Sequence, residues 1–343
     1  MSAQTTTTQK PDESLIKTIW MDYGMVVVLV ILFIACSLAV PNFFSWPNMR
    51  ALSLAVSMTG MVACTMMLVL ASGNFDMSCG AVIACTGMVA AYVTNYFSDS
   101  LGSGAVYIGI AAALGVGLIV GMVNGMTIAY AGINALITTL ATMQITRGFG
   151  YLIGQGKSIG VVEESFFTLG TGSVRLSIPA GWLSDSAILF RIPFPVIITV
   201  ICFIIFGIVL EKTSFGRNSL AIGGNEEAAN LAGIRVSRHK LKLFVLHGLM
   251  SAFAGVVLAS RMTSGQPMTS QGFELDVISA CVLGGVSMAG GVASIWFVFA
   301  GVLIMGIVQN AMNLQNVPTF YQYIVRGSIL LIAVIFDRFK QRR

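Results

Sequence analysis

Charged residues are scarce in this sequence of 343 residues. Asp, Glu, Lys and Arg make up only 10% of the chain, against about 25% in a soluble globular protein. A body of this length with so few charges lacks the polar surface that water requires. This excludes an ordinary soluble enzyme, a nucleic-acid-binding protein and a disordered chain. The sequence therefore predicts an integral membrane protein with no nucleic-acid partner.

Residues that ligate metals or act as catalytic bases are also few. There are two histidines and six cysteines, and the cysteines fall within apolar segments without the spacing of a metal site. His239 and His247 are both expected near one end of a single apolar helix, far from the Gly-x-Ser-x-Gly motif at 156–160. We therefore expect no metal, no cofactor, no disulfide and no enzymatic activity in this chain.

Long apolar stretches are what the chain has in abundance. Hydrophobic residues make up 56% of it and the mean hydropathy is +0.86. Because a helix needs about 20 apolar residues to cross a bilayer core, the sequence predicts an all-α integral membrane protein with about ten transmembrane helices. The expected spans are 23–41, 51–71, 77–97, 104–130, 133–153, 192–210, 241–260, 274–289, 294–314 and 319–336.

The positions of Lys and Arg orient these spans. With an even number of helices both termini lie on one side, and that side also holds the basic segment 211–241. Since cytoplasmic loops carry the excess of Lys and Arg, we expect both termini in the cytoplasm. The predicted organisation is a cytoplasmic tail over 1–22, a transmembrane domain over 23–336 with an outer loop at 154–191, and a basic cytoplasmic tail over 337–343.

Two parts of the sequence are similar to each other. The segment 73–76 opens the third predicted span with Gly and Asp, and 272–276 opens the eighth in the same way. Arg147-Gly148 and Arg326-Gly327 then occupy related places further along. Because the third and eighth spans cross the membrane in opposite directions, the pattern predicts an inverted internal repeat, which is typical of transporters.

The cytoplasmic loop contains the signals of one short helix. Asn225 can cap its first turn, Glu226 and Glu227 suit the positive end of the helix dipole, and Gly233 can end it in a left-handed conformation. The pair Gly223-Gly224 before it permits a turn. One interpretation is a solvated connection that happens to be helical, and the other is a helix with a function outside the membrane.

A resemblance favours the second interpretation. Glu227-Ala228-Ala229 followed by Gly233 resembles the EAA-x-x-x-G pattern of permeases in bacterial ABC importers, without the hydrophobic-Pro ending of the longer family pattern. In that family this helix binds a groove on the ATPase subunit and transmits its motion. The resemblance therefore implies a coupling role for this cytoplasmic loop. The residues implied in coupling are Gly224, Asn225, Glu226, Glu227, Ala228, Ala229 and Gly233.

Longer segments resemble the ribose, xylose, arabinose and galactoside permease family. They are 72–78, 215–229 and 284–291, and the likeness extends over nearly all of the chain. It implies the membrane subunit of an ATP-driven, binding-protein-dependent monosaccharide importer in the bacterial inner membrane, in which 154–191 is a periplasmic loop. Within the family, 133–144 and 259–270 are most similar to permeases for L-arabinose, which is the sugar that we expect.

The resemblance also implies partners and a mechanism. The partners are a cytoplasmic ATPase subunit, a periplasmic sugar-binding protein, a second copy of the chain and the lipid bilayer. The mechanism is alternating access, in which sugar release from the binding protein is linked to the ATP-bound state. The rival hypothesis is an ion-coupled secondary sugar transporter without an ATPase. It requires buried acids along the pathway, whereas the acids of this sequence cluster at the ends of spans.

A neutral sugar needs amides and hydroxyls along its path through the membrane. For any single polar residue, a helix–helix hydrogen bond worth about 0.6 kcal/mol is the better explanation, but as a set these residues predict a polar lumen. Arg326, which lies within the last span, is expected to form a structural ion pair or to reach a helix end. The pathway candidates are Asn74, Asp76, Asn124, Thr142, Gln144, Arg147 and Asn310.

Overall fold

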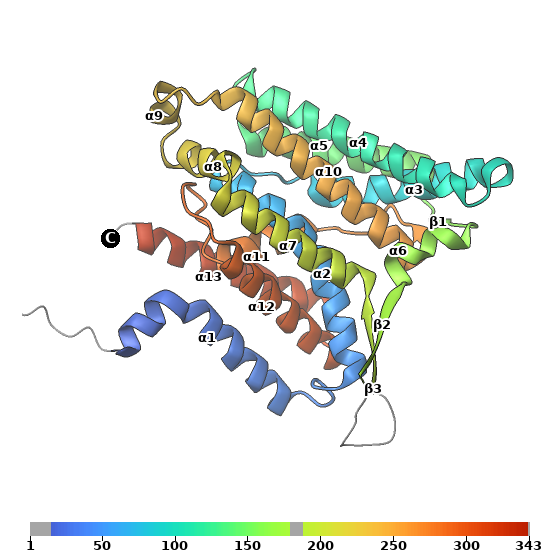
Figure 1. The fold of residues 1–343 in the computed structure, drawn as a ribbon, viewed down its shortest axis with the longest axis horizontal. Helices are drawn as coiled ribbons and strands as arrows, with labels where there is room; N and C mark the ends of the chain where they lie inside the picture. Colours follow the sequence, from blue (N-terminus) through green and yellow to red (C-terminus); the bar gives the residue numbers. More distant parts are fainter. Residues whose placement is uncertain (1–14, 179–187, 342–343) are drawn as a thin grey trace, which may run out of the picture.

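The computed structural model describes residues 15–178 and 188–341, and this part of the chain forms a bundle of long helices (Figure 1). Each predicted span overlaps a helix of the bundle. These helices are α1 (Leu15–Ala39), α2 (Trp46–Ala71), α3 (Cys79–Leu101), α4 (Gly104–Ala129), α5 (Ala135–Gly154), α7 (Phe194–Lys212), α10 (Val236–Met262), α11 (Phe273–Leu283), α12 (Ile295–Leu314) and α13 (Thr319–Gln341).

The helices of the bundle differ in their capacity to cross a membrane. Six of them, in the described part of the chain, are long and apolar enough to do so. They are α2, α3, α4, α7, α10 and α12. The apolar parts of two more, Gly24–Ala39 in α1 and Thr319–Ile335 in α13, are shorter. A multi-pass helical membrane protein is therefore confirmed, whereas the count of ten spans stays a prediction.

The eighth predicted span, 274–289, is wrong as a single helix. Helix α11 has 11 residues and ends at Leu283, so it is about 16 Å long at 1.5 Å per residue and reaches about half of a bilayer core. The chain turns where Gly285, Gly290 and Gly291 take positive φ values of 74°, 89° and 80°. Glycine adopts this left-handed conformation at little cost, which ends the helix despite the apolar sequence.

The two predicted terminal tails are partly helical where the structure describes them, and their boundaries stay a prediction. Helix α1 begins at Leu15, within the predicted tail 1–22, and α13 continues to Gln341 through most of the predicted tail 337–343. Residues 1–14 and 342–343 of these tails lie outside the described residues. Basic residues at the end of a helix can continue it beyond the apolar stretch, which the hydropathy pattern does not register.

The outer loop 154–191 is more structured than the all-α prediction allowed. Two-residue strands β1 (Ile159–Gly160) and β4 (Ser264–Gly265) pair in antiparallel fashion, and β2 (Ser173–Ile178) pairs with β3 (Ile188–Pro193) as a hairpin. Between β1 and β2 lie the 3-10 helix η1 (Glu164–Phe167) and α6 (Thr168–Thr171). Phe166 is fully buried, and its carbonyl oxygen accepts a 2.6 Å hydrogen bond from Ser260 Oγ on α10. The part of the loop that the structure describes is thus bound to the bundle.

Small residues bring α4 and α10 into close contact. A Cβ on Gly121 would lie 2.6 Å from the carbonyl oxygen of Phe244, and one on Gly125 would lie 2.8 Å from the side chain of Leu241. Gly117 lies against Gly248 in the same way. The Gly-xxx-Gly-xxx-Gly ridge of α4, formed by Gly117, Gly121 and Gly125, therefore packs against α10 within the subunit.

The two ends of the bundle differ. Helices α8 (Ser214–Gly224) and α9 (Glu226–Leu231) lie at the same end as the start of α1 and the end of α13 (Figure 1). The β2–β3 hairpin, β1 and α6 lie at the opposite end (Figure 1). The two long connections predicted from the sequence are thus at opposite ends of the bundle, and the single helix α7 joins them.

Candidate functional site

The short helix expected outside the membrane is α9. Asn225 Oδ1 accepts a 2.9 Å hydrogen bond from the backbone N–H of Ala228, which is the predicted N-cap. Glu226 and Glu227 occupy the first turn, and Gly233 follows the helix with φ 88°. Local sequence signals placed this helix correctly because each acts within a single turn.

The residues before α9 are also helical, which the sequence analysis missed. Gly223 and Gly224 are the last residues of α8, and the chain turns after them at Asn225, which has an extended conformation. Thr213 Oγ1 accepts a hydrogen bond from Gly216 N and caps α8, and the inward face of this helix carries Ser219 and Ile222. Glycine has a low helix propensity, but the cap at Thr213 offsets it, so α8 includes both glycines before it ends.

Contacts to α10 fix the α8–α9 segment in place. His239 of α10 lies with its ring centroid 4.6 Å from that of Phe215, and its Nε2 is 2.9 Å from Ser219 Oγ. Lys240 Nζ donates to Glu226 Oε2 at 2.7 Å. The side of α9 that faces away from the bundle is open, and Leu231 on it is 84% exposed. This pair of helices is thus fixed on one side and free to bind a partner on the other.

A cavity of about 720 Å³ lies beneath this segment. The break between α2 and α3 (72–75), the connection from α4 to α5 (132–134) and the end of α8 form its walls. Asn74 and Asn134 contribute amides to it. Asn134 also caps α5, since its Oδ1 accepts a 2.9 Å hydrogen bond from Leu136 N. A neutral, hydroxyl-rich solute would find both donors and acceptors here.

Three pathway candidates share one buried network. Ser78 Oγ donates to Asp76 Oδ1 at 2.6 Å and accepts from Asn124 Nδ2 at 3.0 Å. Asn124 Oδ1 in turn accepts from Thr142 Oγ1 at 2.7 Å. These side chains are at most 8% exposed, so in this conformation they join α3, α4 and α5 and do not line an open path. The sequence analysis missed Ser78, although an Asp two residues before it, and three before the start of α3, is a signal for such a turn.

The remaining candidates are separate from this network. Asn310 of α12 and Asn48 of α2 exchange two amide hydrogen bonds, of 2.8 and 2.9 Å. Arg147 NH1 donates to the carbonyl oxygens of Pro267 and Thr269, 3.2 and 2.7 Å away, and NH2 donates to that of Ser270. Gln144 is exposed on α5.

The expected ion pair of Arg326 is present. Its NH1 lies 3.0 Å from Asp276 Oδ2. The pair joins α13 to the first turn of α11 across half-buried surroundings. An arginine in hydrocarbon requires such a partner, and a structural role accounts for it here.

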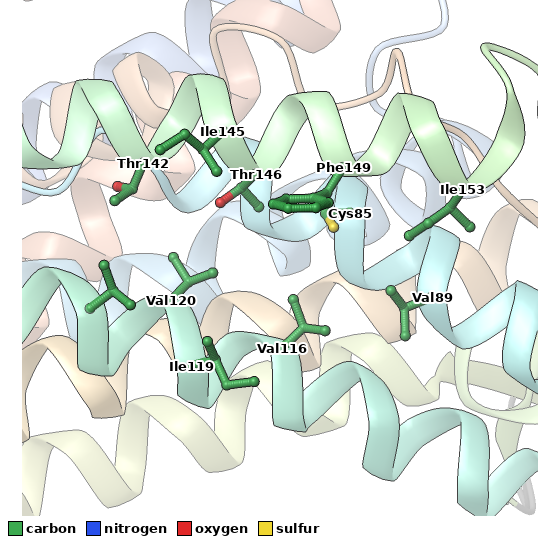
Figure 2. Close-up of a pocket in the computed structure, with 11 residues that line it drawn as sticks. Cys85, Val89, Val116, Ile119, Val120, Thr142, Ile145, Thr146, Phe149 and Ile153 are labelled. Carbon is green, nitrogen blue, oxygen red and sulfur yellow. The ribbon is translucent and has the colours of Figure 1, made fainter.

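A second cavity, of about 360 Å³, lies between α3, α4 and α5 (Figure 2). Figure 2 shows Phe149 and Ile145 of α5 opposite Val116 and Ile119 of α4, with the Thr142 hydroxyl at one end. That hydroxyl is already bound to Asn124. The walls are otherwise almost entirely apolar, so this cavity does not suit a sugar.

Comparisons with known proteins agree with this arrangement. The family model for the permease component of the branched-chain amino acid transport system matches residues 48–334. The L-arabinose transport system permease protein AraH of Escherichia coli K12 is 57% identical over 94% of this chain and 92% of its own length. AraH of Azospirillum brasilense, an L-arabinose ABC transporter permease protein, is 47% identical over 93% and 88%.

More distant relatives carry the name of another sugar. The ribose import permease protein RbsC of Escherichia coli K12 is 34% identical over 94% of this chain and 95% of its own length. No solved structure matches the chain. The family model extends from α2 into α13 and includes both long connections of the bundle. The chain therefore belongs to this permease family and is a membrane transport subunit, not an enzyme.

Proposed function

We propose that this chain is the membrane-spanning permease subunit of an ATP-driven, binding-protein-dependent importer of L-arabinose. The relatives named for L-arabinose are 57% and 47% identical to it, against 34% for the ribose permease. The partners are a cytoplasmic ATPase subunit and a periplasmic sugar-binding protein. An ion-coupled transporter is disfavoured because Asp76 and Asp276 are both bound within the protein.

The observation that carries the coupling role is the placement of α9. It is capped by Asn225, fixed to α10 through Glu226 and exposed on its other side. A helix held in this way can transmit the motion of an ATPase that binds its free side. The residues proposed to couple are those of the predicted segment, Gly224, Asn225, Glu226, Glu227, Ala228, Ala229 and Gly233.

The sugar pathway is proposed to follow α5. Gln144 is exposed there among apolar neighbours. Because burying an amide in lipid is costly, we infer that the Gln144 side chain faces water or a second copy of the chain. Asn134, at the start of α5, and Asn74 line the 720 Å³ cavity. We propose a homodimer in which the path runs between two α5 helices to this cavity. Asp76, Asn124, Thr142, Arg147 and Asn310 then support the path by fixing the helices beside it.

Alternating access by an inverted repeat of about ten spans accounts for the two interrupted helices. Gly73 precedes α3 with φ 75°, and Gly272 precedes α11 with φ 74°. The first turns of the two helices meet, since a Cβ on Gly80 would collide with the side chain of Glu274. Both termini and α9 are proposed to be cytoplasmic and the β2–β3 hairpin periplasmic, in the bacterial inner membrane.

The test is uptake of labelled L-arabinose by vesicles that contain the permease and its ATPase, with the binding protein outside. Replacement of both Glu226 and Glu227 by Ala should lower ATP-driven uptake by about tenfold or more, because the first turn of α9 then loses its charge and its contact with α10. Glu211→Ala, at an exposed acid of the same end, is the matched control. Full uptake by the double variant would exclude the coupling role, and uptake without any ATPase would exclude the importer.

A further inference from the structure

Beneath the α8–α9 segment, three parts of the backbone meet at glycines. Gly223 is near the end of α8, Gly73 follows the end of α2, and Gly290 lies in the connection between α11 and α12. In Figure 1 this connection extends toward α8. The three parts are distant in sequence, and two of them are the breaks that interrupt the pattern of membrane-crossing helices.

The contacts between them are backbone to backbone. Gly291 N donates a 2.9 Å hydrogen bond to Ala71 O, which joins the α11–α12 connection to the end of α2. A Cβ on Gly290 would lie 2.7 Å from Gly223 Cα and 2.9 Å from Gly73 N. A Cβ on Gly223 would lie 2.6 Å from Gly291 N and would also collide with Ala71 O. With no side chain between them, the three parts have no room to slide independently.

The outer side of this contact is continuous with α9. Ala229 of α9 is buried with Ile222 of α8 and Val236 of α10, so α8 and α9 form one packed unit. Helix α9 follows Gly224 through the single residue Asn225. A displacement of α9 therefore displaces Gly223 as well, and Gly223 touches both breaks.

We propose that Gly223 and Gly290 are positioning residues that deliver the displacement of α9 to both interrupted helices. This proposal rests on the proposed function, since it requires an ATPase to move α9. One arm of the path leads through 72–78 to Asp76 and the network that reaches Thr142 on α5. The other leads through the 284–291 backbone to α11 and its pair with Arg326. The ATPase surface and the sugar path are thus connected by direct contact as well as through the chain.

The first test uses substitutions that fill this contact. Gly223→Ala and Gly290→Ala should each lower ATP-driven L-arabinose uptake by about tenfold, while the ATPase still binds and its stimulation by the loaded binding protein is lost. Gly115→Ala is the control for a helical glycine and Gly156→Ala, in the loop after α5, for a glycine with positive φ. Both have open space around the added Cβ, so they should retain uptake within about twofold.

Three outcomes of this test separate the hypotheses. If the unchanged permease shows no ATP-dependent uptake, the proposed function itself fails. If it does, and Gly223→Ala and Gly290→Ala transport and respond to the binding protein as their controls do, the positioning role is wrong. If the two glycines had only a structural role, the substitutions would lower the melting temperature and ATPase binding together. The stimulation by the loaded binding protein would then not be lost selectively.

A second measurement needs no substitution. Hydrogen–deuterium exchange of the assembled transporter, with and without ATP and vanadate, should show changed protection at 72–75 and at 285–291 together with α9. If ATP and vanadate change the exchange of α9 alone and leave both glycine segments as they were, the proposal is overturned, whatever the substitutions do to folding.

Discussion

At the scale of single residues, several buried polar side chains of this bundle bind one another. Asn124 illustrates this, because its amide nitrogen donates to Ser78 Oγ and its amide oxygen accepts from Thr142 Oγ1. A buried amide with both ends bound joins α4 to its two neighbours. Gln144, which is exposed on α5, has the opposite environment although it carries the same chemical group. Burial thus distinguishes Asn124, which we propose supports the path, from Gln144, which we propose lines it.

This contrast predicts different effects for two amide-to-alanine changes. Asn124→Ala leaves Ser78 and Thr142 without their partner and should lower the free energy of unfolding by about 1–3 kcal/mol. Gln144→Ala should leave stability within about 0.5 kcal/mol, because the residue is exposed, while it lowers L-arabinose uptake. Thermal unfolding of the purified protein and vesicle uptake measure the two effects. A melting temperature that falls equally for both would contradict the assignment.

The sequence predicted the local part of these interactions and missed the distant part. The cap of α9 was readable because Asn225 and Ala228 are three residues apart. The partners Asn124 and Ser78 are 46 residues apart, and Asn48 and Asn310 are 262 apart. Nothing in a single sequence shows which of many polar residues in apolar helices will meet. The pathway set therefore stays a prediction, and in this conformation Asp76, Asn124 and Thr142 are joined in one buried network.

At the scale of helices, glycine has two distinct roles in this protein. In α4 it lies within a regular helix and allows α10 to approach closely, as the contact of Gly121 with Phe244 O shows. At Gly285 and Gly290 glycine takes positive φ, where helix α11 has ended and the chain changes direction. The hydropathy pattern treats both alike, which is why the span predicted over 274–289 was too long. The spacing of four residues between Gly117, Gly121 and Gly125 is typical of the first role.

Two alanine substitutions in α4 should have opposite effects. Gly121→Ala places a methyl group against the backbone of α10 and should destabilise the protein by about 1–3 kcal/mol. Gly115→Ala, six residues earlier in the same helix, meets nothing within 4 Å and should stabilise it by about 0.5–1 kcal/mol, because alanine is the better helix former. Thermal unfolding in the same detergent compares them. Equal loss of stability in both would show that α4 and α10 do not pack in this way.

At the scale of the whole molecule, the two ends of the bundle carry different secondary structure. One carries the α8–α9 segment, and the other carries the β2–β3 hairpin (Figure 1). In that hairpin Arg175 lies directly opposite Arg191, and both are exposed. Like charges opposite each other repel, so this face suits an acidic protein surface. The proposed ATPase subunit and the proposed binding protein would thus approach from opposite sides of the membrane.

Labelling from one side checks this orientation. Val162 at the hairpin end is 74% exposed and Leu231 on α9 is 84% exposed, whereas the native cysteines of the described part are buried or half-buried. A membrane-impermeant maleimide should label Val162→Cys in right-side-out vesicles and Leu231→Cys only in inside-out vesicles. The unsubstituted protein is the control for background labelling. The reverse pattern would place α9 outside and exclude an ATPase partner there.

The shortness of α11 has a consequence for how the protein is made. Its 11 residues include Glu274 and Asp276, so the segment is too short and too charged to enter the bilayer on its own hydrophobicity. Asp276 is synthesised 50 residues before its partner Arg326. We therefore expect α11 to wait at the translocon, beside helices already inserted, until α13 has left the ribosome. Biogenesis of this permease should fail late, near the last helix, when either member of that ion pair is missing.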